Sequence, residues 1–142
     1  MKVVIQEEAT GCAIACSAAI AGLSYKEAKQ TANSLGIFAV DSLLWSNTKS
    51  IRNLLVALGF HTGKKIDFTN WDSLADCSLL ASKWHLEDGK PYWHWVVFMR
   101  EEKRSYVLDS NASLAENLII DLERVDAKWF IPVKKMNIII TK

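Results

Sequence analysis

The chain is 142 residues long, which is typical of one domain, and 50% of its residues are hydrophobic while 23% are charged. This balance excludes a disordered, fibrous or low-complexity chain, the more so because only 6 residues are glycine and 2 are proline. The 17 basic and 16 acidic residues leave a formal net charge of +1, without the basic excess typical of nucleic-acid binding. We therefore expect a single domain over residues 1–142, with no nucleic-acid partner and no charge-driven attachment to anionic lipid.

The sequence shows no targeting or membrane-spanning pattern. Its longest apolar stretch, residues 12–23, is shorter than the ~20 residues that a spanning helix requires. The first five residues run into Gln6 and two glutamates before the apolar core of a signal peptide can form. The cysteine count of 3 is odd, which argues against a disulfide framework and fits a reducing compartment. We expect a cytoplasmic protein, or one exported without a cleaved signal peptide.

The first predicted helix follows Thr10, a suitable N-cap, and ends at Gly22, a suitable C-cap. Between them, small and apolar side chains occupy every face of the helix. That distribution is typical of a buried central helix and not of an amphipathic surface helix.

Two further helices are predicted from caps and periodicity. The second covers residues 25–35, where Ser24 and Glu27 have the spacing of a capping box and a glycine follows the last residue. The third covers residues 49–58, where one face carries the apolar side chains of Ile51, Leu54, Leu55 and Leu58.

The second half of the chain is predicted to contain strands. Residues 78–82 indicate a short strand, and residues 92–99 alternate between two faces as a longer strand does. The charged run 100–104 predicts a turn, and residues 106–108 a returning strand, so these segments together predict a hairpin.

The tail is predicted as a helix over residues 122–129 and a strand over residues 137–141. Helices that come first and strands that come later are typical of an α+β domain. We expect an antiparallel sheet packed on the buried first helix.

Cys12 lies at the start of that buried helix. The unpaired N–H groups and the dipole of a helix N-terminus favour a thiolate, and Gly11 allows a tight turn into the helix. The alternative is that Cys12 is a small inert core residue among alanines.

His94 and Asp109 are predicted to lie at the same end of the hairpin. His94 begins the longer strand, and Asp109 follows the returning strand directly. A carboxylate there can accept a hydrogen bond from one imidazole nitrogen, which leaves the other nitrogen to take a proton from a thiol. Alternatively His94 is a core histidine, and Asp109 is a turn residue at a strand end.

Gln6 precedes Cys12 by six positions. An amide at this place can donate a hydrogen bond to a developing oxyanion beside the backbone N–H of Cys12. A solvated surface glutamine is the alternative, since two glutamates follow it.

The order of Gln6, Cys12 at a helix start, His94 in a strand and Asp109 after the next strand resembles the papain-like cysteine peptidases. It is most similar to the bacteriocin-processing peptidase domains that cleave after double-glycine leaders, and the resemblance spans nearly the whole chain. It implies a papain-like fold with Cys12 as nucleophile, His94 as general base and acid, Asp109 as its orienter and Gln6 as oxyanion-hole donor. It implies a peptide or protein substrate and no cofactor.

Three positions depart from that family. It usually has Asp before the nucleophile and Gly after it, where this chain has Gly11 and Ala13, and it usually has Pro after the aspartate, where this chain has Ser110.

Two other functions stay open. The same fold serves bacterial effectors that deamidate a glutamine side chain, because both reactions begin with attack on an amide carbonyl. A non-catalytic binding module that keeps the fold is the third reading.

The remaining cysteines, histidines and tryptophans are interpreted as structural. Cys16 lies one turn after Cys12 and is expected in the core, since no histidine and cysteine cluster with zinc spacing accompanies it. Cys77 is expected to begin a strand, and His61 and His85 to lie on the surface. The 6 tryptophans are expected in the core or the cleft wall, and those flanking His94 (Trp93 and Trp95) to shield it from water.

Overall fold

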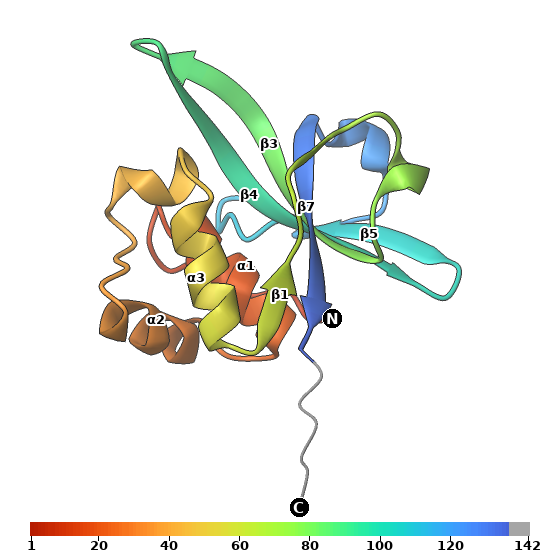
Figure 1. The fold of residues 1–142 in the computed structure, drawn as a ribbon. Helices are drawn as coiled ribbons and strands as arrows, with labels where there is room; N and C mark the ends of the chain where they lie inside the picture. The colour runs from red at the N-terminus through yellow and green to blue at the C-terminus, as the bar shows by residue number, and fades with distance from the viewer. Residues whose placement is uncertain (137–142) are drawn as a thin grey trace, which may run out of the picture.

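In the computed structural model, which describes residues 1–136, a helical half packs against one face of a β-sheet (Figure 1). The helical half contains α1 (Cys12–Ala21), α2 (Tyr25–Ser34), the 3-10 turn η1 (Ser42–Trp45) and α3 (Lys49–Ala57). The three predicted helices are confirmed, and their ends agree with the predictions to within a residue.

The sheet follows the helices in the chain. Its strands are β1 (Phe60–Thr62), β2 (Ile66–Asp67), β3 (Cys77–Glu87), β4 (Lys90–Glu101), β5 (Arg104–Leu108), β6 (Leu118–Ile119) and β7 (Ala127–Lys135), with short 3-10 turns η2 (Trp71–Ser73) and η3 (Leu122–Arg124) between them. The spatial order is β1-β7-β3-β4-β5-β6, and β2 also pairs with β7. Every described strand pair is antiparallel, so the predicted α+β class with an antiparallel sheet is confirmed.

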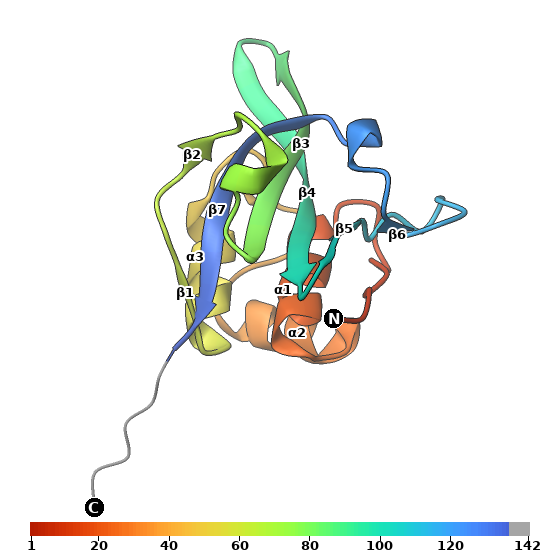
Figure 2. The same ribbon diagram turned by 90° about the vertical axis from the view of Figure 1, so that its right-hand side faces the viewer.

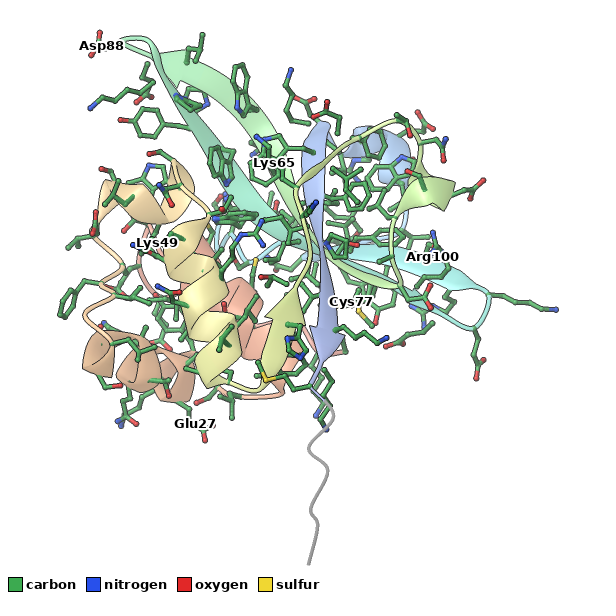
Figure 3. All side chains as sticks on the ribbon, in the orientation of Figure 1. Glu27, Lys49, Lys65, Cys77, Asp88 and Arg100 are labelled. Carbon is green, nitrogen blue, oxygen red and sulfur yellow. The ribbon has the colours of Figure 1, made fainter. Side chains whose placement is uncertain are left out.

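The two central strands are longer than predicted. The predicted segments 78–82 and 92–99 lie inside β3, of 11 residues, and β4, of 12 residues. Their hairpin extends beyond the rest of the sheet, with Asp88 near its tip (Figures 1 and 3). The turn between β4 and β5 is shorter than the predicted 100–104, because Glu101 already pairs with Arg104.

The predicted helix over residues 122–129 is wrong. Only η3 is helical there, and the chain then enters β7, which lies between β1 and β3 in the sheet. Trp129, Phe130 and Ile131 are all buried, since the strand is covered on both faces. A continuous apolar run of this kind has no periodicity that separates a buried strand from a buried helix. The predicted strand over residues 137–141 lies outside the described residues.

Two apolar clusters lie on opposite faces of the sheet. The larger joins the sheet to the helices and contains α1, whose residues Cys12–Ile20 are all buried. The smaller covers the other face with Leu80, Val96, Phe98 and Phe130 against the segment around η2. Figure 2 shows α1 behind the sheet and the N-terminal segment beside β5. Because α1 is the part of the helical half that packs against β4 of the sheet, its first residue, Cys12, lies where the two halves meet.

Candidate active site

The start of α1 depends on a glycine. Thr10 was predicted as the N-cap, whereas the structure has Gly11 there, without a side-chain cap. A Cβ atom on Gly11 would collide with the Tyr25 hydroxyl, so this position requires glycine for space. The close approach of α2 brings Tyr25 next to the residue that precedes Cys12.

His94 and Asp109 form a direct hydrogen-bonded pair. His94 Nε2 lies 2.7 Å from Asp109 Oδ1, and Oδ1 also accepts a hydrogen bond from the backbone N–H of Asn111 at 3.0 Å. The register of the hairpin brings them together, since Leu108, the residue before Asp109, pairs with Val97 on β4. The predicted proximity of the two side chains is therefore confirmed.

Asn117 fixes the loop that carries Asp109. Its side-chain amide donates to the backbone carbonyls of Asp109 at 2.7 Å and Asn111 at 2.8 Å, and its own carbonyl accepts from the Asp109 N–H at 2.8 Å. No motif or periodic pattern in the sequence marks Asn117. Its contacts span six and eight positions of irregular chain, for which the sequence holds no periodic signal.

The surroundings of the His94–Asp109 pair favour its charged form. Burial alone lowers the pKa of His94, but hydrogen bonds with Asp109 and Cys12 and their charges together raise it to about 9. Burial raises the pKa of Asp109, but the hydrogen bond and charge of His94, the Asn111 N–H and the charge of Lys83 bring it below the usual value. Near neutral pH the pair is therefore an imidazolium and a carboxylate. Because Asp109 occupies Nε2, Nδ1 is the nitrogen left for Cys12.

Cys12 differs from the other two cysteines in its surroundings. All three are free thiols, and Cys12 is the one that interacts with His94. Cys16 is fully buried and its Sγ donates to the Trp95 carbonyl at 3.4 Å, while Cys77 begins β3. Burial raises the pKa of Cys77 to about 12 and that of Cys16 well above its usual value, so both thiols stay protonated. The structure thus places both in the roles expected of structural cysteines.

Gln6 is buried and fully hydrogen-bonded, so the surface-residue alternative is wrong. It is 8% exposed, its Oε1 accepts from Ser110 Oγ at 2.8 Å, and its backbone N–H donates to the Ser110 carbonyl at 2.9 Å. Its Nε2 donates to the carbonyls of Glu8 at 2.9 Å and Ala9 at 2.8 Å. Both amide hydrogens therefore hold the segment that leads to Cys12. Donation to an oxyanion requires one of them to leave its carbonyl.

A cavity of about 400 Å³ lies beside Gln6 and His94. Both Gln6 and His94 line it, and the remaining lining residues come from two loops, Glu7, Glu8 and Ala9 on one side and Asn111, Ala112 and Ser113 on the other. A larger cavity of about 600 Å³ lies at the opposite end of α1, where none of the four predicted site residues lines it.

The tryptophans beside His94 in sequence are core residues. Trp93, Trp95 and Trp129 contact one another edge to face, with ring centroids 4.8 to 5.6 Å apart, and each is at most 7% exposed. Trp95 also donates from Nε1 to the Leu44 carbonyl at 2.7 Å, which ties β4 to η1. Their main effect is to hold the sheet against the helical half.

Within residues 1–136, no group of three or more histidine, cysteine, aspartate or glutamate side chains is placed to hold a metal ion. His61 and His85 are exposed, as expected. No helix in the same range has the length and apolar character needed to cross a membrane.

The fold of this chain is similar to those of two peptidase domains among the solved structures. One is a double-glycine motif protease from an AMS/PCAT transporter in complex with a leader peptide, with a TM-score of 0.61, 14% identity, and coverage of 95% of this chain and 91% of that chain. Another is the peptidase domain of Streptococcus ComA, a bifunctional ABC transporter of a quorum-sensing pathway, with a TM-score of 0.60, 16% identity, and coverage of 96% and 98%. No family model and no curated protein sequence matches the chain. At these identities the likeness establishes the fold, and it confirms the papain-like architecture predicted from the sequence.

Proposed function

We propose that this protein is a papain-like cysteine hydrolase that cleaves an amide bond in a peptide or protein. The observation that carries the proposal is the hydrogen-bonded His94–Asp109 pair, together with Cys12, which begins a buried helix and contributes to the raised pKa of His94. The fold shared with a double-glycine motif protease and with the peptidase domain of ComA supports it. Cys12 is the proposed nucleophile, His94 the acid and base, and Asp109 the residue that orients His94.

His94 is proposed to hold the proton that the Cys12 thiol gives up, so that the sulfur attacks as a thiolate. Because the pKa of His94 is raised to about 9, its imidazole already carries a proton at neutral pH. The Cys12 thiolate attacks the substrate carbonyl and forms a C–S bond. His94 Nδ1 then gives its proton to the leaving amine as the C–N bond breaks. In the second half-reaction His94 takes a proton from water, the resulting hydroxide attacks the thioester, and the thiolate leaves.

The oxyanion is proposed to be held by the backbone N–H of Cys12 and by Gln6. The Gln6 amide is within the same cavity as His94, and both its hydrogens now bind carbonyls of the preceding loop. A developing negative charge is a stronger hydrogen-bond acceptor than a neutral carbonyl. The oxyanion therefore replaces one of the two loop carbonyls as the acceptor of a Gln6 amide hydrogen as the transition state forms.

The proposed substrate is a peptide segment that lies in the cavity between the Glu8 loop and the Asn111 loop. One neighbour of the same fold is complexed with a leader peptide, so a double-glycine leader peptide is the first substrate to test. Deamidation of a glutamine side chain uses the same thioester chemistry, with ammonia as the leaving group.

Mass spectrometry of candidate peptides and proteins after incubation with the protein tests this proposal, with Cys12→Ala as the inactive control. A split chain that the control does not produce supports peptide-bond cleavage. A mass gain of about 1 Da at a glutamine supports deamidation through the same intermediate. If neither change is seen and mild alkylation does not label the Cys12 thiol, the hydrolase proposal is overturned in favour of a binding module.

A further inference from the structure

Ser110 links the aspartate loop to the segment that leads to Cys12. It directly follows Asp109, is 3% exposed, and holds Gln6 twice, through its hydroxyl at 2.8 Å and its carbonyl at 2.9 Å. Because Gln6 is also buried, these bonds form where water does not compete with them.

The carbonyls of Glu8 and Ala9 determine which end of the Gln6 amide faces them, and the Ser110 hydroxyl binds the opposite end. It donates to Oε1, while Nε2 points to the carbonyls of Glu8 and Ala9. A reversed amide would place Oε1 against two carbonyl oxygens and lose both hydrogen bonds. A serine hydroxyl can itself rotate to accept, so the donor role of Ser110 is set by the same arrangement.

From Gln6 the connection continues to the nucleophile. The Glu8 carbonyl that accepts from Gln6 also accepts from the backbone N–H of Gly11 at 3.0 Å, and Gly11 precedes Cys12. On its other side, the Glu8 carboxylate accepts from the Tyr25 hydroxyl at 2.7 Å and lies 3.1 Å from Lys29 Nζ. The loop before Cys12 is therefore held between α2 and the Ser110–Gln6 pair.

We infer that Ser110 is a positioning residue, which keeps the Gln6 amide and the Glu8–Ala9 segment in the orientation that the oxyanion requires. The inference rests on the proposed hydrolase function and adds a residue to it. Ser110 touches neither substrate nor nucleophile in this role. It acts through Gln6, so its loss has no consequence once Gln6 is removed.

A glutamine-specific NMR measurement tests the structural part without any substrate. The chain contains two glutamines, buried Gln6 and exposed Gln30, so glutamine labelled with ¹⁵N at the side-chain amide gives two pairs of N–H signals, one pair from each residue. In Ser110→Ala we expect the Gln6 signal to shift and its hydrogens to exchange at least about tenfold faster, while Gln30 is unchanged. Ser78→Ala is the matched control, because Ser78 is a buried serine whose hydroxyl donates to a carbonyl remote from the site. An unchanged Gln6 signal in Ser110→Ala overturns the inference.

A double-mutant cycle with Gln6→Ala tests the functional part. We expect Ser110→Ala to lower kcat about 10- to 100-fold with little change in KM, as a small misplacement of a donor does, and to add nothing in the Gln6→Ala background. Ser110→Thr keeps the hydroxyl and is expected to restore the Gln6 signal and most of kcat. If Ser110→Ala lowers kcat by the same factor in the wild type and in the Gln6→Ala background, the inference is overturned. If the wild type cleaves no substrate, the proposed function fails, and the NMR spectrum still decides whether Ser110 orients Gln6.

Discussion

Replacing Asp109 by Asn is predicted to remove a pH-dependent contribution to stability. In the wild type the pKa of His94 is raised from 6.5 to about 9, which corresponds to a preference for the imidazolium in the folded state of about 3 kcal/mol. A pKa raised by folding gives stabilisation that is complete below pH 6.5 and is lost as the pH rises through about 9. The free energy of unfolding should therefore fall by up to about 3 kcal/mol across this range.

Burial lowers the pKa of His94, and the hydrogen bond and negative charge of Asp109 help to raise it. Asp109→Asn removes the negative charge and the hydrogen bond to a carboxylate, while the effect of burial stays. The slope of stability against pH between 6.5 and 9 should consequently be shallower in the variant. Urea unfolding of both proteins at several pH values in this window measures the difference. Exposed His85, whose pKa is also raised, is common to both proteins and cancels in the comparison. Parallel curves for the two proteins would refute the pairing of His94 with Asp109 as the cause.

Three further results are expected. Limiting iodoacetamide near neutral pH should label Cys12 before Cys16 and Cys77, whose thiols are protonated by burial, and peptide mapping that finds either of those labelled first would exclude Cys12 as the reactive thiol. His94→Ala should remove nearly all turnover in a peptide-cleavage assay, since both proton transfers pass through it, and substantial remaining activity would contradict that role. Gln6→Ala should lower kcat about 10²–10³-fold with little change in KM and with Cys12 labelling retained, whereas normal kcat would leave the oxyanion to backbone N–H groups.

The parts of the fold predicted from sequence are those that short-range signals specify. The capping box of Ser24 and Glu27 is present as predicted, and Gly22 ends α1 in the left-handed conformation. The uniformly small and apolar α1 is buried on all sides because no face of it is polar. In each case the residues that determine the structure lie within one or two turns of each other.

The missed features depend on contacts between distant parts of the chain. Strand β7 forms because it pairs with β3, where Phe130 lies opposite Leu80, some fifty positions earlier in the chain. The sequence pattern around Phe130 contains no signal of that pairing. The same holds for the site. His94 and Asp109 were predicted together because a hairpin joins them, whereas the bond from Ser110 to Gln6 spans 104 positions and left no local signal.

The most direct test of the proposed mechanism is intact-protein mass spectrometry of a reaction with a cleavable peptide, quenched in acid during turnover. The mechanism predicts that the acyl fragment of the peptide is attached to the protein, that peptide mapping places it on Cys12, and that Cys12→Ala carries no such adduct. Peptide cleavage by Cys12→Ala at the wild-type rate, or an acyl group on any residue other than Cys12, would contradict it.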